Sequence, residues 1–306
     1  MKREGIIVFI VGPTAIGKTR LAIKLATRIK GEIISSDSMQ VYRGMAILSQ
    51  APTASERKKA RHHLVGVLDP GREYNAASFI NRAAKLIGSL IKRGKIPVVA
   101  GGSGLYIKAL MDGLFPSPPP DLGFRGSMQK FVRKYGAGKL HEKLAKIDPA
   151  SAAKIHPNDE RRIIRALEIR HSTGKTMTEL KSRTRGLADR YDIRIFGLTN
   201  TRSKIYKEIE LRTDRMFEGR VLGEVKRLKK RRLSKTASAI LGLKEISDYL
   251  DGKCDLDTAK SLIKKKTRHF AKRQFTWFRA DKRIRWFDMD RASEAGIIKR
   301  IIKGMG

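Results

Sequence analysis

The sequence contains a single cysteine, Cys254, among its 306 residues. One cysteine excludes an internal disulfide and any zinc site built from several cysteines, so a reducing compartment is expected. The longest unbroken apolar run covers only residues 6–11, whereas a membrane-spanning helix needs about twenty. This run also lacks the length of a secretory signal. We therefore expect a cytoplasmic protein that does not enter a membrane.

Acidic residues are scarce: Asp and Glu number 30 against 67 Lys and Arg, which gives a net charge of +37. The excess peaks locally, with seven basic residues among the ten of 226–235 and six among the ten of 264–273. A surface bias that only keeps the protein soluble is one explanation. We favour a polyanionic partner, most simply a nucleic acid, because such a surface attracts phosphates. The chain is 41% apolar, so wholesale disorder is excluded.

Short apolar segments alternate with helical periodicity in the first 115 residues. Apolar segments at 6–11, 33–34 and 96–100 are typical of the buried strands of a parallel sheet. Helical spacing covers 20–30 and 76–93 between them. This alternation predicts an α/β fold with a parallel sheet.

The pattern changes after residue 115, where a serine and three prolines at 117–120 form a stiff break. Residues 122–185 show helical periodicity without a good strand, including a strongly amphipathic helix at 161–172. A strand is expected at 193–198, followed by helices over 203–250 and 256–280. We therefore predict two domains: a core made of 1–115 and 191–306, with basic C-terminal helices, and a helical insertion domain at 116–190.

The loop after the first strand matches the phosphate-loop pattern G-x-x-x-x-G-K-[ST]. It consists of Gly12, Pro13, Thr14, Ala15, Ile16, Gly17, Lys18 and Thr19. Between a buried strand and a helix, such a loop wraps its N–H groups around a phosphate, and the helix N-terminus adds positive potential. Lys18 would neutralise phosphate charge and Thr19 would bind Mg²⁺. An ordinary glycine-rich turn is the alternative, but the strand–loop–helix context favours a diphosphate or triphosphate site.

The phosphate loop alone does not identify the group that is transferred. Many phosphate-loop enzymes hold Mg²⁺ with an aspartate at the end of an apolar strand, but the segment 96–100 ends in two glycines. The first acid after a strand is Asp37, placed where a carboxylate can take a proton from an acceptor substrate. A helix N-cap explains the same residue equally well.

Three segments resemble the tRNA dimethylallyltransferases, also called isopentenyl-diphosphate:tRNA transferases. They are the phosphate loop, residues 37–45 and residues 101–109, and further matches follow in family order at 62–64, 69–74, 162–168 and 267–279. The resemblance implies a phosphate-loop core that moves a dimethylallyl group from dimethylallyl diphosphate to a tRNA and releases diphosphate. The implied acceptor is the exocyclic amine of the adenosine just 3′ of the anticodon. No zinc finger follows the core, so the shorter bacterial form is expected, as a monomer.

The resemblance also assigns roles to residues. Asp37 is the expected general base, Lys18 and Arg215 stabilise the leaving diphosphate, and Mg²⁺ on Thr19 is the cofactor. Contacts with the tRNA anticodon stem-loop are implied for Asp37, Ser38, Met39, Gln40, Ser103, Arg161, Arg162 and Arg165. Charge alone adds Lys272 and Arg273 as contacts with the RNA backbone. Trp277 and Phe278 can stack on a base, but aromatic residues on an amphipathic helix are more typical of a core.

Two segments depart from the family pattern. Residues 46–52 read AILSQAP where the family has DIGTAKP, residues 239–245 read AILGLKE where it has QAIGYKE, and Ser103 replaces the common threonine. Three alternatives stay open: a small-molecule or nucleotide kinase, an adenylate isopentenyltransferase, and an RNA-binding protein with a relic loop. The net charge of +25 on residues 116–306 favours the tRNA enzyme over the first two. Intact Lys18, Thr19 and Asp37 argue against the third.

Overall fold

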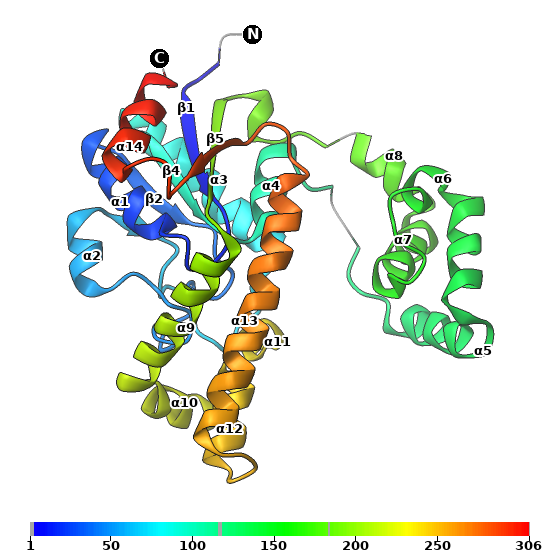
Figure 1. The fold of residues 1–306 in the computed structure, drawn as a ribbon. Coiled ribbons are helices and arrows are strands. Elements are labelled where there is room, and N and C mark those ends of the chain that lie inside the picture. Colours follow the sequence, from blue (N-terminus) through cyan, green and yellow to red (C-terminus); the bar gives the residue numbers. More distant parts are fainter. Residues whose placement is uncertain (1–2, 116–117, 183, 306) are drawn as a thin grey trace. The chain divides into compact units, whose positions relative to one another are not determined.

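The computed structural model describes residues 3–115, 118–182 and 184–305, which belong to two compact units (Figure 1). One unit contains the residues up to 111 and from 187 onward, and the other contains 112–186. The sequence analysis placed the two boundaries after residues 115 and 190. Each unit has its own hydrophobic core and is described by itself.

The first unit is built on a six-stranded parallel sheet with the strand order β3-β2-β4-β1-β5-β6. Its strands are β1 (Ile6–Val11), β2 (Glu32–Ser35), β3 (His62–His63), β4 (Pro97–Gly101), β5 (Asp192–Thr199) and β6 (Arg285–Asp288). The predicted parallel α/β fold is confirmed. Two strands are not predicted from the sequence: β3, which is only two residues long, and the edge strand β6, in which only Phe287 is buried. Neither segment has the continuous apolar run of a central strand.

Helices cover both faces of this sheet, because the central strand β1 is apolar on both sides. Ile7, Phe9 and Val11 lie in one core, and the alternate residues Val8 and Ile10 lie in the other. The helices of this unit are α1 (Lys18–Arg28), α2 (Ala54–Lys59), α3 (Ala76–Lys92), α4 (Gly104–Asp112), α9 (Arg202–Glu218), α10 (Val221–Lys229), α11 (Lys235–Ser238), α12 (Leu243–Leu250), α13 (Leu256–Arg279) and α14 (Glu294–Lys303). Over the described ranges, no helix has the length and apolar character needed to cross a membrane.

The second unit is entirely helical over the residues that the structure describes, as the periodicity of 122–185 predicted. It consists of α5 (Leu122–Ile147), α6 (Pro149–Ala152), α7 (Glu160–Thr173) and α8 (Met177–Ser182). Gly136, with φ of 83°, bends α5 in the left-handed backbone region that glycine tolerates. Leu140 and Leu144 pack with Ile163 and Leu167 in the core of this unit.

A buried carboxylate joins two helices of the second unit. Glu168, on α7, is fully buried and accepts two hydrogen bonds of 2.8 Å from the guanidinium of Arg125 on α5. Arg165, one turn before Glu168, donates to the same carboxylate and to the carbonyl of Pro118 at 2.9 Å. Burial alone would raise the pKa of Glu168, but the hydrogen bonds from Arg125 and Arg165 lower it to about 2. Arg165 is therefore engaged by groups inside this unit, and the RNA contact expected for it stays a prediction.

Candidate active site

Three predicted site segments leave the sheet at the same edge. The phosphate loop follows β1, Asp37 follows β2, and Ser103 follows β4, and these three strands run parallel. Because the carboxyl ends of parallel strands meet at one edge, the fold brings these segments together in the crevice where α/β proteins bind ligands. The edge is reached by α9 and α13 from the C-terminal part of the chain (Figure 1).

Glycines give the phosphate loop its path. Gly12 has φ of 145°, and a Cβ there would lie 2.8 Å from the carbonyl oxygen of Leu198 on the neighbouring β5. Gly17 caps α1 with φ of 89°, which leaves the first N–H groups of that helix without a capping side chain. Orphan N–H groups at a helix N-terminus bind anions. The backbone of the loop is therefore compatible with the predicted anion site.

Gln274, on α13, links the phosphate loop to the loop after β4. Its Oε1 accepts a 2.8 Å hydrogen bond from the N–H of Thr14, and its Nε2 donates to the carbonyl of Gly102 at 2.9 Å. A Cβ on Gly102 would lie 2.1 Å from this Nε2, so the close approach requires glycine. Gln274 lies in the segment 267–279 that resembles the family, but no role is predicted for it from the sequence. Its only signal was a polar residue on the apolar face of an amphipathic helix.

Lys18 begins α1 and is strongly perturbed. Its Nζ donates to the carbonyl of Pro13 at 2.5 Å. Burial, together with the nearby charge of Arg212, lowers the pKa of Lys18 to about 7, although the carboxylate of Asp37 acts in the opposite direction. The negative charge of a bound diphosphate would favour the protonated, positively charged form of Lys18.

Asp37 lies in a turn directly after β2, with one carboxylate oxygen engaged by the backbone. Its Oδ1 accepts the N–H groups of Met39 at 2.8 Å and Gln40 at 3.3 Å, and so closes the turn after β2. The hydrogen bonds of the described residues to this carboxylate involve Oδ1 and not Oδ2. The charge of Asp37 also acts on Lys18 and Arg212. No helix begins after Asp37 in the described structure, so its Oδ1 closes a turn and does not cap a helix. Its role as a general base stays a prediction.

The arginine beside the phosphate loop is Arg212, not Arg215. Arg212, on α9, donates from Nη1 to Thr14 Oγ1 at 3.5 Å, and Arg215 is exposed on the same helix. Burial lowers the pKa of Arg212, and the Asp37 carboxylate opposes this shift. The structure thus places Arg212, and not the predicted Arg215, next to the phosphate loop, and Arg212 becomes our candidate for the diphosphate arginine. The two residues lie about one helical turn apart on α9.

The remaining candidates lie in different surroundings. Ser38 and Met39 are half-buried in the turn that Asp37 closes, and Ser103 is half-buried just before α4. Lys272 and Arg273 are exposed on α13, whereas Arg161 and Arg162 are exposed on α7 of the second unit. Phe278 is buried, which confirms the core interpretation for that residue. Trp277 is half-buried, and its ring lies so close to Gly104 that a Cβ there would be 2.1 Å from Cδ1.

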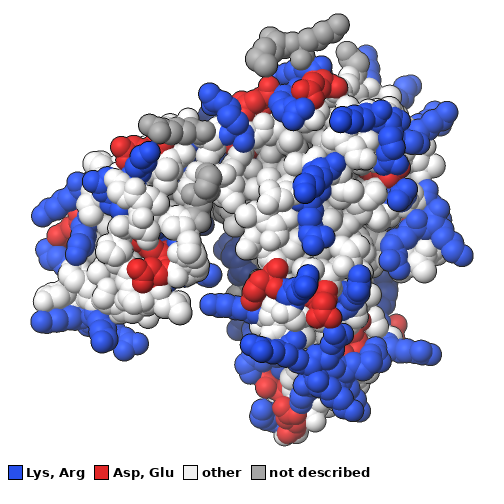
Figure 2. Space-filling view, turned by 180° about the vertical axis from the view of Figure 1, so that it is seen from behind, with Lys and Arg blue, Asp and Glu red and all other residues white. Residues whose placement is uncertain are grey.

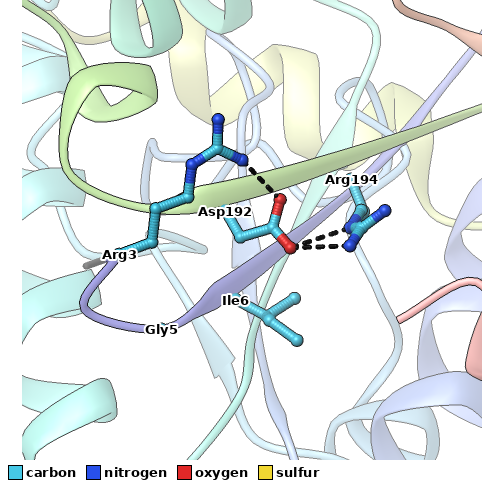
Figure 3. Close-up of a pocket in the computed structure, with 5 residues that line it drawn as sticks. All are labelled: Arg3, Gly5, Ile6, Asp192 and Arg194. Atoms are coloured by element: carbon cyan, nitrogen blue, oxygen red, sulfur yellow. Dashed lines mark hydrogen bonds and ion pairs between the residues drawn. The ribbon is translucent and has the colours of Figure 1, made fainter. Parts of the chain in front are cut away.

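A surface hollow at the opposite edge of the sheet is not part of this site. It has a volume of about 400 Å³ and is lined by Arg3, Gly5, Ile6, Asp192 and Arg194 at the amino ends of β1 and β5 (Figure 3). Both arginines are bound to the Asp192 carboxylate, at 2.9 Å for Arg3 and 2.8 Å for Arg194. These ion pairs neutralise much of the local charge.

Positive side chains are spread widely over the surface. Figure 2 shows Lys and Arg over much of the face in view, with Asp and Glu in smaller groups. Across the described ranges, no three His, Cys, Asp or Glu side chains cluster in a way that could hold a metal ion. A divalent cation at the phosphate loop would therefore depend on Thr19 and on oxygens of a bound phosphate.

Comparison with known proteins gives a consistent picture. The family model described as IPP transferase matches residues 40–281. A tRNA dimethylallyltransferase of Carboxydothermus hydrogenoformans is 45% identical over 302 residues, which cover 98% of this chain and 97% of the relative. A tRNA dimethylallyltransferase of Bacillus subtilis is 43% identical over 286 residues, covering 92% and 90% of the two chains.

Solved structures resemble the whole chain as well. A full-length tRNA isopentenylpyrophosphate transferase from Bacillus halodurans has a TM-score of 0.72 at 39% identity and covers 99% of this chain and 97% of its own. A eukaryotic dimethylallyltransferase, described as acting on tRNA, has a TM-score of 0.76 at 27% identity, with 99% and 80% covered.

Proposed function

This chain belongs to the IPP transferase family, and from this premise we propose that it transfers a dimethylallyl group from dimethylallyl diphosphate to tRNA. The acceptor that best fits the site is the exocyclic amine of the adenosine just 3′ of the anticodon. The single observation that carries this proposal is the position of Asp37, whose charge acts on both Lys18 and Arg212 beside the phosphate loop. One edge of the sheet thus holds a base for the acceptor and cations for the donor.

The chemistry follows from these groups. The adenine amine attacks the first carbon of the dimethylallyl group, the bond from that carbon to the diphosphate oxygen breaks, and Asp37 takes the proton lost by the amine. The departing diphosphate gains negative charge, which the N–H groups of the loop, Lys18 and Arg212 stabilise. The donor binds where a phosphate-loop kinase would bind a nucleotide, without the aspartate that such kinases carry, because β4 ends in Gly101.

The protein groups at the phosphate loop that could coordinate a metal fit Mg²⁺ bound mainly by diphosphate oxygens. Thr19 lies in the first turn of α1, and no acidic cluster is available in the described ranges to hold the ion by itself. Mg²⁺ prefers oxygen ligands and keeps several waters, so one hydroxyl and a diphosphate suffice. When bound by Thr19, the ion would neutralise charge on the leaving group.

The acceptor must leave the stack of an RNA loop to reach Asp37. Enzymes that modify a base extrude it into a pocket, at a cost of a few kcal/mol that is smallest in single-stranded loops. The exposed cations Lys272 and Arg273 on α13, and Arg161 and Arg162 on α7, are candidates to offset this cost through contacts with phosphates. We propose the anticodon stem-loop as the part of the tRNA that is bound.

One incubation tests the proposed function directly. The protein is mixed with Mg²⁺, dimethylallyl diphosphate and either an anticodon stem-loop RNA or AMP, and the products are weighed by mass spectrometry. Addition of one dimethylallyl group to the stem-loop alone is the expected result. Addition to AMP instead would indicate a free-nucleotide enzyme, and no addition to either would contradict the proposal.

RNA binding is expected to depend strongly on salt. If the protein contacts four phosphates, a plot of log affinity against log salt should have a slope of about −3, taking roughly 0.7 per single-stranded contact. Filter binding of the stem-loop between low and high salt measures this slope. A flat response would refute the interpretation of the +37 charge as an RNA-binding feature.

Donor binding is expected to weaken as the pH rises above about 7. The pKa of Lys18 is lowered to about 7 in the free protein, and a bound diphosphate raises it, so binding above pH 7 takes up a proton. The affinity for inorganic pyrophosphate should then fall by up to about tenfold per pH unit, until the raised pKa is passed. Calorimetric titration at several pH values measures this.

The matched control for this pH profile is Lys18→Ala. The ionisation of pyrophosphate itself contributes equally to both proteins, so only the difference between the two profiles reports on Lys18. Parallel profiles would show that Lys18 does not titrate in this range.

A further inference from the structure

The segment 46–52, which departs from the family pattern, places an amide beside the site. Gln50 stands where the resembling family has alanine, and its φ is 54°, in the left-handed region. Its side-chain Oε1 accepts a hydrogen bond from Nε of Arg212, and its main-chain carbonyl accepts one from Nη2 of Arg212 at 3.3 Å. Two nitrogen atoms of one guanidinium are thus held by a single residue.

Gln50 is itself fixed on several sides. Its Nε2 donates to the carbonyl of Ile47 at 3.0 Å, and its carbonyl also accepts Nε2 of Gln40 at 3.2 Å. The buried carboxylate of Glu224, on α10, accepts the N–H groups of Ile47 at 3.1 Å and Leu48 at 2.9 Å. The turn that carries Gln50 is therefore anchored to α10 by contacts that do not involve Arg212.

We propose that Gln50 is a positioning residue for the donor, which orients Arg212 so that its remaining N–H groups face the diphosphate. This inference rests on the proposed function, since it assigns the anion at the phosphate loop to the prenyl donor. Gln50 engages Nε and Nη2, and Nη1 points to Thr14 Oγ1 at 3.5 Å, inside the phosphate loop. A guanidinium offers five N–H donors in a fixed plane, so holding one edge aims the other.

The electrostatics explain why such a holder is useful. Arg212 is half-buried and lies near the half-buried cation Lys18, so two like charges share one partly desolvated site. Without an anion, both desolvation and repulsion favour a guanidinium that swings away. Two carbonyl-type acceptors from Gln50 keep Arg212 in place without cancelling its charge, which a carboxylate would do. The diphosphate then meets a site that is already arranged, so less ordering accompanies binding.

The test uses Gln50→Met, which keeps most of the side-chain volume and removes the amide. We expect its affinity for inorganic pyrophosphate, measured by calorimetry, to fall about tenfold, the effect of losing one hydrogen bond to a charged group. The KM for dimethylallyl diphosphate should rise by a similar factor, and stem-loop RNA affinity should be unchanged. Gln129→Met removes an amide from an exposed site in the second unit and is the control, with wild-type values expected.

A double-mutant cycle with Arg212→Ala separates positioning from a general effect on the fold. If Gln50 acts through Arg212, adding Gln50→Met to Arg212→Ala should change pyrophosphate affinity by less than about twofold. A full tenfold loss in that background would overturn the proposal, as would wild-type pyrophosphate affinity in Gln50→Met alone. Melting curves show whether each variant is folded, and Gln50→Ala replaces Gln50→Met if the latter does not fold. Failure of wild-type protein to prenylate RNA would count against the proposed function, and pyrophosphate binding is measured independently of it.

Discussion

Replacing Lys18 by alanine is expected to lower the rate of prenyl transfer by about 10²–10³-fold at saturating donor, the usual effect of removing one donor to a developing oxyanion. The N–H groups of the loop and Arg212 would remain, so residual activity is expected. RNA affinity should stay near the wild-type value, because the exposed cations proposed to contact RNA lie on α13 and α7.

The same substitution should not destabilise the fold. The pKa of Lys18 lies well below that of a lysine in an unfolded chain, so the folded state disfavours the charged side chain. This penalty applies below the unfolded pKa, is complete below about pH 7, and disappears in Lys18→Ala. The melting temperature of the variant at pH 6 should therefore be equal to or above that of the wild type.

Single-turnover rates, filter binding and melting curves at pH 6 and pH 9 test both expectations. Normal turnover of Lys18→Ala at saturating donor would remove the side chain from the mechanism. A large loss of stability at pH 6 would show that packing of the aliphatic part of Lys18 stabilises the fold by more than its buried charge destabilises it. The loss of activity would then have to be tested with a second variant, Lys18→Met, which keeps the aliphatic part.

The sheet and the phosphate loop could be predicted from the sequence because their signals are local. β1 is an unbroken apolar run with a glycine-rich loop behind it, and burial on both faces requires that pattern. The predicted helix 76–93 matches α3 closely, since Asn75 caps it by accepting the N–H of Ser78 at 3.0 Å. β6 could not be predicted in the same way, because its place at the sheet edge depends on pairing with β5, far earlier in the chain.

The arginine that lies beside the phosphate loop is Arg212 and not the predicted Arg215, for a physical reason. Arg212 and Arg215 both flank the buried positions Thr213 and Met216 of α9, so helical periodicity does not choose between them. Arg212 is distinguished from Arg215 by its hydrogen bonds to Gln50, a residue 162 positions earlier in the chain. Long-range contacts of this kind leave no trace in local spacing.

Arg165 and Gln274 illustrate the same limit from two directions. Arg165 resembles a phosphate-binding residue, because two further arginines lie nearby in the sequence. In the structure it instead pairs with the buried carboxylate of Glu168, three residues away. In the sequence, Gln274 is only a polar residue on the apolar face of a helix. In the structure its side chain joins two loops of the site. Residue type and spacing predict which face of a helix is buried, but not which polar group a side chain on that face will contact.

Replacing Asp37 by asparagine is expected to lower the chemical step by about 10²–10⁴-fold, the usual contribution of a general base. The substitution keeps an Oδ1 that can accept the N–H groups of Met39 and Gln40, so the turn after β2 should persist. It removes the carboxylate that would take the proton from the adenine amine. RNA affinity should change little, because asparagine can still bond to an adenine edge.

One side effect of Asp37→Asn must be separated from the loss of the base. The Asp37 carboxylate raises the pKa of Lys18 against burial and Arg212, so its removal lowers that pKa further and weakens donor binding above neutral pH. Single-turnover rates are therefore measured at pH 6.5 with saturating donor, at two Mg²⁺ concentrations, beside a melting curve. A rate restored by raised Mg²⁺ would make Asp37 a metal ligand. An unchanged rate with unchanged stability would leave it only its place in the turn, where asparagine can accept the same N–H groups. The base for prenyl transfer would then have to be sought elsewhere.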